Sequence, residues 1–376
     1  QGCLTSAAST SRNERIACAE ALFDVGHPDY GIHVTKFAGE TTRFVLPAAH
    51  ARIRIKADEY VVGAEDLTDD ERPCHVFSIA KDFWFAKYPV TNCEYACFVE
   101  AGGYTDPKWW DECSASEHRR VHGANQRIVQ RMIDRAKQIK ALSLEEYERS
   151  MRYNEHQTQW RHWYEKRRTT PIEKLETDFH RDYPPGRNEP RPHFWLDPGF
   201  NGLGQPVVGV DFYEARAYSR WLNAMCSTSS LNLACDLPNE DEWEAACAGT
   251  QHWMWSANAD VFDSTRYNTA EEIEGELPVG KTTPVGAYPQ GATPQGVHDL
   301  CGNIWEWTLT EYVSGRARDV RAGNENDPKR DVPFRVVRGG SWRRNQYYAR
   351  AARRSSNGPF DRSYAIGFRL VFRPVS

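Results

Sequence analysis

The feature that most limits the possible folds of this chain is a polar segment held between two strand-like segments. Val337-Arg338-Gly339-Gly340-Ser341-Trp342 precedes it, and Ile366-Gly367-Phe368-Arg369-Leu370 follows it. The residues between them are rich in Tyr, Arg, Ser and Asn and contain almost no aliphatic side chains. Tyr and Arg supply anchors in recognition surfaces, whereas Ser and Asn supply adaptable hydrogen bonds. The pattern favours a binding face on a rigid scaffold over an ordinary solvated loop.

Length and composition set broad bounds on the class of protein. The chain has 376 residues, enough for one large domain or two ordinary ones. A hydrophobic content of 40% and a net charge of -5 argue against disorder and do not indicate nucleic-acid binding. Because no run of eighteen apolar residues occurs, we expect no membrane span. The 13 Trp and 17 Tyr residues predict a loop-rich domain with an aromatic core.

The cysteines bear on metal binding and on the compartment. Ten cysteines are scattered without a Cys-x-x-Cys pair, which argues against a zinc site. Cys93 and Cys97 lie in an apolar helical pattern and are expected to be small core residues. We therefore expect reduced thiols in a cytoplasmic protein. A lipoprotein cysteine at Cys3 is a weaker alternative, which residues before Gln1 would decide.

Start and stop signals divide the chain into segments. Residues 12 to 26 predict a helix that ends at Gly26 before Pro28, so we expect an N-terminal helical segment over 1–36 and a domain over 37–376. Helices are also predicted over 212–222 and 238–246. The charged stretch at about 107–193 has few apolar residues. We expect it to be an inserted helical segment that lies on the main domain without a core of its own.

Three further motifs, together with the two C-terminal segments, carry a resemblance to a known family. They are Tyr88-Pro89-Val90-Thr91-Asn92, Leu237-Pro238-Asn239-Glu240-Asp241-Glu242-Trp243-Glu244-Ala245-Ala246 and Gly302-Asn303-Ile304-Trp305-Glu306-Trp307. The chain resembles the formylglycine-generating enzyme (sulfatase-modifying factor) family from about residue 44 to residue 372, apart from the insertion. This resemblance implies an α+β, loop-rich fold of the C-type lectin kind.

The resemblance also identifies where catalysis would occur. The family's catalytic centre is a pair of cysteines that bind copper(I) shortly after the Gly-Gly-Ser motif. The matching positions here hold Arg344 and Ala349. Neither residue can act as a nucleophile or as a soft-metal ligand. We therefore expect no copper and no formylglycine-generating activity, and favour a protein that is not an enzyme.

Structural calcium is a further implication of the resemblance. One implied site uses the carboxylates of Asp299 and Glu306 with the carbonyls of Gly302 and Ile304, which are oxygen ligands of the kind calcium prefers. In the alternative, Asp299 caps a turn and Glu306 pairs with a buried Arg. A second implied site uses Asn268, Thr269 and Val279, although Leu277, with Glu276 beside it, stands where an acid is expected.

Members of this fold also serve as variable proteins of diversity-generating retroelements, in which a C-terminal cassette is mutated. This implies a protein or other macromolecular ligand bound by residues 343–365. The predicted contact residues are Arg343, Arg344, Asn345, Tyr347, Tyr348, Arg353, Ser355, Ser356, Asn357, Asp361, Ser363 and Tyr364. Arg350, Arg354, Pro359 and Arg362 are expected to be fixed. In the alternative, the segment is a structural cap in which Arg350, Arg354 and Arg369 are buried against acids.

Two other functions remain open. Iron-dependent sulfoxide synthases of the family take histidine ligands from a separate helical domain, so a non-heme metal-dependent oxidase is the main alternative. Its candidate ligands are His118, His122, His156, His162 and His193. Ala124 replaces the acid of the expected His-x3-His-x-Glu pattern, which favours surface histidines. The third possibility is an accessory domain of a larger signalling or defence protein.

Overall fold

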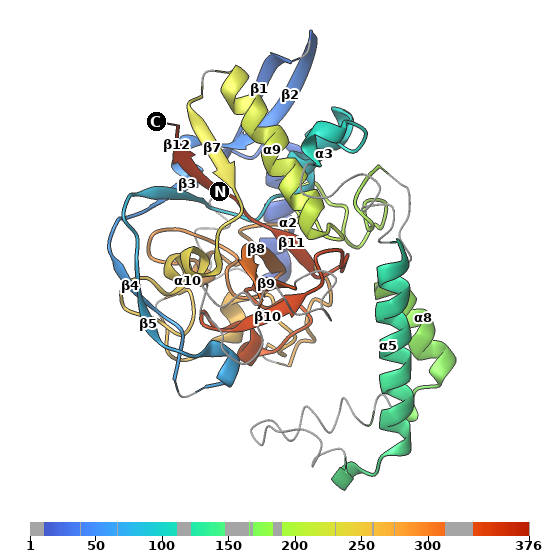
Figure 1. The fold of residues 1–376 in the computed structure, drawn as a ribbon. Coiled ribbons are helices and arrows are strands. Elements are labelled where there is room, and N and C mark those ends of the chain that lie inside the picture. The colour runs from blue at the N-terminus through green and yellow to red at the C-terminus, as the bar shows by residue number, and fades with distance from the viewer. Residues whose placement is uncertain are drawn as a thin grey trace, which may run out of the picture. The chain divides into compact units, whose positions relative to one another are not determined.

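The computed structural model describes residues 11–37, 39–65, 67–110, 122–146, 165, 168–182, 190–229, 231–257, 259–273, 275–312 and 334–375 (Figure 1). The chain forms two compact units. The larger unit consists of Gln1–Glu112 and Pro190–Ser376, and the smaller unit is the segment between them in the sequence, Cys113–Glu189. Over the described ranges, no helix combines the length and apolar character that a membrane span needs.

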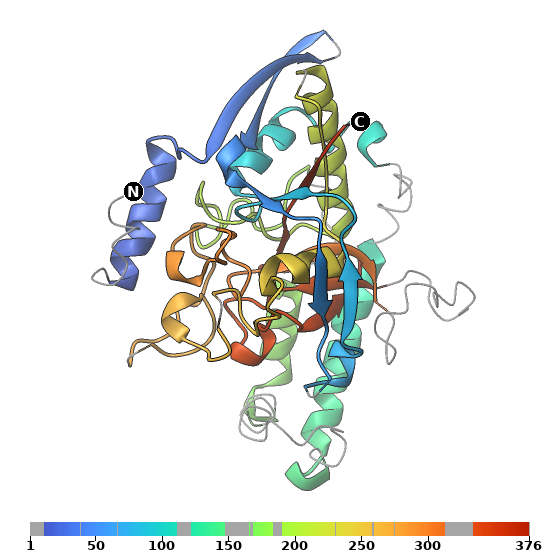
Figure 2. The ribbon, with the colours of Figure 1, turned by 90° about the vertical axis from the view of Figure 1, so that its left-hand side faces the viewer.

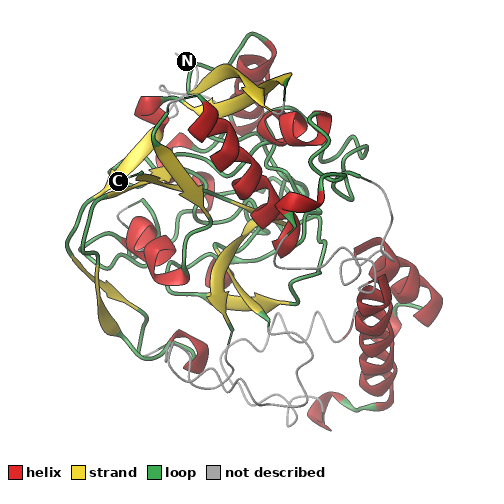
Figure 3. Ribbon diagram, turned by 45° about the horizontal axis from the view of Figure 1, so that its top comes forward, coloured by secondary structure: helices red, strands yellow, loops and turns green. Residues whose placement is uncertain are grey.

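The larger unit is built on two four-stranded sheets and two hairpins (Figure 3). The first sheet has the order β10-β9-β8-β11, which are Arg354–Asn357, Arg335–Arg338, Trp305–Glu311 and Ile366–Phe368. The second has the order β3-β6-β12-β7, which are Arg52–Ile55, Phe83–Ala86, Val371–Pro374 and Leu233–Asp236. The hairpins are β1 (Tyr30–Phe37) with β2 (Glu40–Pro47), and β4 (Glu59–Val62) with β5 (His75–Ser78).

Each α-helix in the described part of this unit begins with a reciprocal capping box. The helices are α2 (Arg12–Asp24), α3 (Asn92–Glu100), α9 (Phe212–Thr228) and α10 (Glu240–Ala248). In each, the N-cap side chain accepts a backbone N–H three residues on, and the Glu there accepts the N-cap N–H. The 3-10 turns are η1 (Ala49–Ala51), η2 (Asp69–Glu71), η3 (Pro107–Trp109), η4 (Ser264–Arg266), η5 (Pro289–Gly291) and η6 (Gln346–Tyr348). The N-terminal helix α2 packs through Ala19 on Ala287 and Tyr288. Figure 2 shows this helix in blue at the left of the view, beside the label N.

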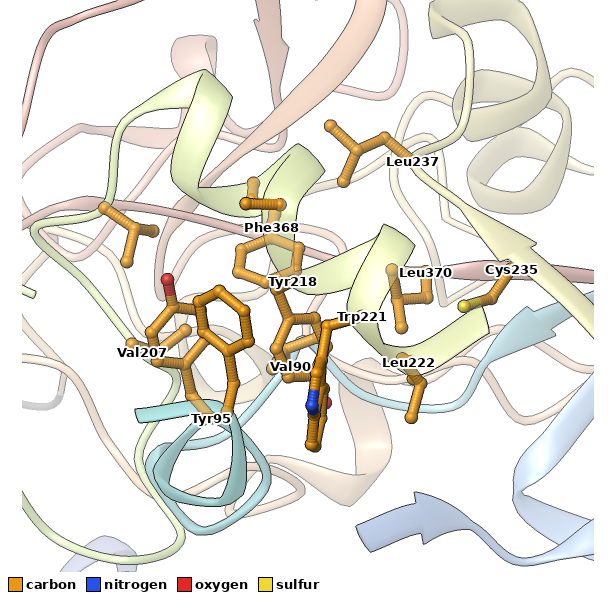
Figure 4. Close-up of a cluster of buried hydrophobic side chains, with 14 of the residues drawn as sticks. Val90, Tyr95, Val207, Tyr218, Trp221, Leu222, Cys235, Leu237, Phe368 and Leu370 are labelled. Atoms are coloured by element: carbon orange, nitrogen blue, oxygen red, sulfur yellow. The ribbon is translucent and has the colours of Figure 1, made fainter. Parts of the chain in front are cut away.

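The main core is aromatic, as the Trp and Tyr content predicts. Tyr95 of α3 stacks on Tyr218 of α9 with ring centroids 5.2 Å apart, and Phe368 of β11 lies edge-on to Tyr218 at 5.5 Å (Figure 4). Trp221 is buried beside them. Each such side chain contributes about 1.5–3 kcal/mol to folding through burial alone. This core joins the two four-stranded sheets and α9, and it includes Phe368 of β11 and Phe372 of β12.

The smaller unit consists of helices α5 (His122–Ala141) and α8 (Ile172–Asp182) in its described part. They pack through a cluster of five buried apolar side chains, Val129, Ile133, Ala136, Leu175 and Phe179. From the sequence we expect no separate core in this segment, and the structure differs. Sparse apolar residues suffice here because they lie on one face of each helix.

Candidate ligand-binding site

The polar segment is anchored at both ends in the first sheet. Its N-terminal flank is β9, which pairs with β8 and β10, and its C-terminal flank is β11, which runs parallel to β8. Between β9 and η6, Gly340 has a φ of 74°, and a Cβ there would lie 2.8 Å from the carbonyl oxygen of Tyr348. Only glycine allows this backbone conformation and close approach. The chain therefore turns back tightly on itself immediately before the exposed residues.

Buried arginines fasten the segment to the rest of the unit. Arg350 lies 2.5 Å from Glu71 of η2, and Arg354 binds both carboxylate oxygens of Glu240 at 2.5 and 2.9 Å. The two-point geometry of the Arg354 pair gives strong, directional hydrogen bonds, whereas Arg350 contacts Glu71 through one nitrogen. Arg350 and Arg354 are thus buried and paired with acids, as in the structural-cap alternative, so part of the segment is structural.

The same kind of pair occurs at two further arginines of the C-terminal region. Arg362 lies 3.0 Å from Glu214 in the first turn of α9 and 3.5 Å from Asp211, the N-cap of that helix. Burial alone would lower the pKa of Arg362, but the negative charges of Glu214 and Asp211 raise it. Arg369 binds the carboxylate of Glu306, at 2.8 Å in the closest contact. Three of the four positions predicted to be fixed, Arg350, Arg354 and Arg362, therefore hold arginines that pair with buried carboxylates.

Exposure divides the predicted contact residues into three groups. Arg343, Arg344 and Tyr347 are exposed. Five are half-buried: Tyr348, Arg353, Ser355, Ser356 and Asn357. Four are buried: Asn345, Asp361, Ser363 and Tyr364. These last four do not form part of the outward surface that the sequence analysis predicts for them.

Local packing explains why two of the four are buried. Asp361 accepts hydrogen bonds from the side-chain amide of Asn357 at 3.1 Å and from the N–H of Gly358 at 2.9 Å, which closes the turn after β10. Tyr364 packs in a small apolar cluster with its ring 5.4 Å from that of Trp342 and 5.6 Å from that of Phe194. The Asp361 contacts are local, whereas those of Tyr364 join residues far apart in the sequence, so the local pattern of polar residues does not reveal the latter.

The outward residues are ordered by stacking of arginine on aromatic rings. The guanidinium of Arg343 lies 4.5 Å from the ring centroid of Tyr364, and those of Arg344 and Arg353 lie 5.0 and 5.1 Å from that of Tyr348. Such contacts contribute about 0.5–1 kcal/mol each at exposed sites. They also pre-orient planar guanidinium groups whose N–H edges suit a ligand's acceptors.

The two positions that correspond to the family's catalytic cysteines differ in solvent exposure. Arg344 is exposed, whereas Ala349 is completely buried in an apolar cluster. Cys247 and Cys301 lie in the same cluster with their sulfur atoms 3.9 Å apart, and burial raises the pKa of the Cys247 thiol. Cys93, Cys97, Cys226, Cys235, Cys247 and Cys301 do not form disulfides.

The first implied calcium site does not fit that ion. Both carboxylate oxygens of Glu306 are taken by Arg369, and one also accepts the indole N–H of Trp243 at 2.7 Å. The Asp299 carboxylate accepts the N–H of Gly286 at 2.8 Å from a left-handed turn at φ 57°, and burial raises its pKa to about 6. The carbonyl of Gly302 accepts the N–H of Ile304 at 2.8 Å. The alternative, a turn at Asp299 and a buried ion pair at Glu306, describes the observed contacts.

The second implied site offers oxygens without an acid. Asn268 Oδ1 and Thr269 Oγ1 are buried and have no hydrogen-bond partner in the described part of the chain. Val279 is half-buried, Leu277 is exposed, and Glu276 pairs with Arg12 at 2.9 Å. Among the described residues, no group of three or more His, Cys, Asp or Glu side chains is placed to hold a metal. Calcium at Asn268 and Thr269 stays a prediction.

The candidate histidines of the oxidase alternative are only partly described. His118, His156 and His162 lie outside the described residues, and the side chain of His122 does as well. The ring of His193 packs edge-on against that of Phe194, with centroids 4.5 Å apart. The carboxylates that the sequence analysis misses are Glu71, Glu214 and Glu240. Glu71 is the last residue of η2, and Glu214 and Glu240 lie in the first turns of α9 and α10.

Comparison with curated proteins identifies relatives of this chain. Hercynine oxygenase of Mycobacterium tuberculosis is 27% identical over 309 residues, covering 81% of this chain and 55% of its own. The formylglycine-generating enzyme of the same organism is 25% identical over 351 residues, covering 86% and 98%. The chain thus spans about half the length of the hercynine oxygenases it matches.

Solved structures and a family model agree on the fold. PvdO from Pseudomonas aeruginosa is similar with a TM-score of 0.50 and 18% identity over 91% of this chain and 98% of its own. The chain has the α+β, C-type-lectin-like fold. The model for the sulfatase-modifying factor enzyme 1-like domain matches residues 40–374. The chain therefore belongs to the sulfatase-modifying factor enzyme 1-like domain family.

Proposed function

We propose that this protein is a non-catalytic binding domain for a protein ligand. Its display face comprises the exposed Arg343, Arg344 and Tyr347 with the half-buried Tyr348 and Arg353. One observation carries the proposal. Exposed arginines lie over aromatic rings, and the buried ion pairs of Arg350 and Arg354 hold the same segment in place. Rigid placement of Arg and Tyr lowers the entropy that binding costs.

The side chains at the two positions that match the family's catalytic cysteines, Arg344 and Ala349, support a non-catalytic role. A buried Ala349 has no group for nucleophilic or redox chemistry, and the Arg344 guanidinium repels a second cation such as copper. Arg and Tyr are instead the residues that most often dominate binding energy at protein interfaces. The display face therefore suits recognition.

The direct test uses peptides selected from a phage-displayed random library on the wild-type protein. We expect Arg344→Ala and Tyr347→Ala each to weaken binding of the selected peptides at least ~10-fold, because hot-spot side chains contribute upwards of about 2 kcal/mol. Isothermal titration calorimetry measures the affinity. Arg54→Ala is the matched control, since Arg54 is also exposed but lies on β3 and pairs with Asp82. The proposal fails if both variants bind the peptides as the wild type does.

We further propose that the exposed display positions are the diversified ones. Variation at Arg343, Arg344 and Tyr347 leaves the buried pairs of Arg350 and Arg354 intact, so many sequences can share one scaffold. A reverse-transcriptase gene beside a near-identical, Asn-rich template repeat is the expected genomic arrangement. If this gene and its template repeat are absent, the diversification proposal is wrong, but the binding proposal is unaffected.

Similarity to hercynine oxygenase favours a second candidate, a non-heme metal-dependent oxidase. Elemental analysis of the purified full chain separates the two functions. Stoichiometric iron that is lost on replacing His118, His122, His156 and His162 would support the oxidase, whereas a metal content unaffected by these changes would count against it. An accessory role in a larger protein agrees with the partial coverage of the relatives.

A further inference from the structure

Two cations of the display face lie over one aromatic ring. The guanidinium carbons of Arg344 and Arg353 are 5.0 and 5.1 Å from the ring centroid of Tyr348, so they are separated by no more than the sum of these distances. Arg344 is exposed, and the side chain of Arg353 is 19% exposed. A ligand on the display face can therefore reach both guanidinium groups at once.

These two arginines carry more positive charge than nearby acids balance. Over the described ranges, Arg344 forms no ion pair with an acid. Arg353 lies 3.4 Å from Glu71 Oε1, but the same oxygen is 2.5 Å from Arg350. Because one carboxylate cannot neutralise two guanidinium groups, a net positive charge remains beside the ring of Tyr348.

Hydrogen-bond donors of both arginines are open to a ligand. Nη1 of Arg353 donates to Thr68 Oγ1 at 2.9 Å, whereas its Nη2 makes no hydrogen bond in the described part of the chain and is not closed to solvent. The backbone of Arg344 is held in place, since its N–H donates to Ser341 and its carbonyl accepts the N–H of Ala270, each at 2.9 Å. Donors on a fixed backbone bind a ligand with little further loss of entropy.

The kind of donor selects the kind of ligand. A guanidinium group only donates, and its hydrogen bonds are strongest to charged acceptors. A carboxylate has two oxygens with about four lone-pair sites, so a single carboxylate can accept from two guanidinium groups. The arrangement of Arg344 and Arg353 therefore suits an acidic side chain.

Acids on both sides of the pair count against a nucleic acid. Glu271 accepts the backbone N–H of Gln346 at 3.0 Å, and Asp70 accepts the hydroxyl of Tyr312 at 2.8 Å while its carbonyl accepts from Arg354. A DNA duplex carries a negative charge about every 1.7 Å along its axis, so neighbouring phosphates would meet these carboxylates. An isolated acidic residue in a protein would not.

We propose that Arg344 and Arg353, placed over the ring of Tyr348, bind the side-chain carboxylate of an Asp or Glu residue in the protein ligand. The inference rests on the proposed function and adds the chemistry of the partner, an acidic segment. The ligand carboxylate accepts hydrogen bonds from Arg344 and from Nη2 of Arg353.

The first test uses the library-selected peptides, synthesised with an amidated C-terminus so that side chains supply the only carboxylates. We expect replacement of one Asp by Asn, or one Glu by Gln, to weaken binding at least ~10-fold in calorimetry, because the charged acceptor is lost. Arg344→Gln and Arg353→Gln should weaken it similarly. Arg54→Gln is the matched control, since Arg54 is exposed on β3 and pairs with Asp82.

Charge reversal separates direct recognition from a structural effect. Arg344→Glu should lose the acidic peptide and bind its counterpart, with Lys at the critical position, at least ~10-fold more tightly than the wild type does. Raising NaCl from ~50 to ~500 mM should weaken binding of the acidic peptide to the wild type at least ~3-fold and leave its Asn or Gln counterpart unchanged. Because Arg344 is exposed, this test holds even if Arg353→Gln lowers the Tm.

The outcomes distinguish the inference from the function on which it rests. If Tyr347→Ala abolishes peptide binding but the Asn and Gln counterparts bind as tightly as the acidic peptides, the carboxylate site is wrong and the display face stands. Selected peptides that bind only with a free C-terminal carboxylate would also overturn the side-chain assignment. If no selected peptide distinguishes the wild type from Tyr347→Ala, or if a single-stranded RNA binds in place of peptides, both proposals fail.

Discussion

At the scale of single residues, a buried carboxylic acid makes stability depend on pH near neutrality. Glu94 closes the capping box of α3 and accepts the N–H and the hydroxyl of Thr91, each at 2.8 Å. Burial raises the pKa of Glu94 to about 7, although these two hydrogen bonds oppose the rise. The folded protein therefore keeps a proton on Glu94 at pH values where the unfolded chain, with an ordinary pKa of 4.5, has lost it.

The sign of the effect follows from proton linkage. Since the folded state binds more protons between pH 4.5 and about 7, the stabilising contribution of Glu94 is complete below pH 4.5 and is lost as pH rises through 7. We expect Glu94→Gln, which keeps an acceptor at the same place, to remove this decline. Urea unfolding of both proteins from pH 4 to 8 measures it. A constant difference in the free energy of unfolding across that range would contradict the assignment.

Residue-scale features of the site differ in how far sequence can predict them. The exposed character of Arg343, Arg344 and Tyr347 is predictable because polar residues follow a Gly-Gly turn. The burial of Asn345 and Tyr364 is not, because it depends on how η6 and the Phe194 cluster fold over them. Side chains of the same polarity thus fall on opposite sides of one short turn.

At the scale of elements, ion pairs connect strands to helix starts. Arg354 on β10 binds Glu240, the first residue of α10, and the pair is buried on both sides. We expect Arg354→Ala to lower the free energy of unfolding by about 3–5 kcal/mol, because it leaves the Glu240 carboxylate buried without its cation. Arg54→Ala, which breaks the exposed pair with Asp82, should cost about 0–1 kcal/mol. Equal losses in denaturant titrations of the two variants would contradict this account.

Element boundaries are partly encoded locally. The capping boxes at Asp211–Glu214 and Asn239–Glu242 are visible as short sequence patterns, and α9 and α10 begin within two residues of the predicted starts at 212 and 238. Ion-pair partners carry no such pattern. Arg350 and Glu71 are separated by 279 residues, so only the assembled sheets bring them together.

At the scale of the whole molecule, the inserted unit has its own small core. The cluster of Val129, Ile133, Leu175 and Phe179 joins α5 to α8. We expect replacement of residues 113–189 by a flexible linker of ~15 residues to leave the Tm of the larger unit within ~2 °C, because loop-closure entropy changes slowly with length. Calorimetry of the shortened protein measures this. Loss of the main transition would show that the larger unit needs the insertion to fold.

The place of β12 has a consequence for how the chain matures. Val371–Pro374 lies inside its sheet, between β6 and β7, and β11 just before it completes the other four-stranded sheet. Neither sheet can close while these residues are still within the ribosome. Synthesis must therefore proceed past residue 374 before the two sheets are complete, and a product that ends earlier leaves its aromatic core exposed and prone to aggregation.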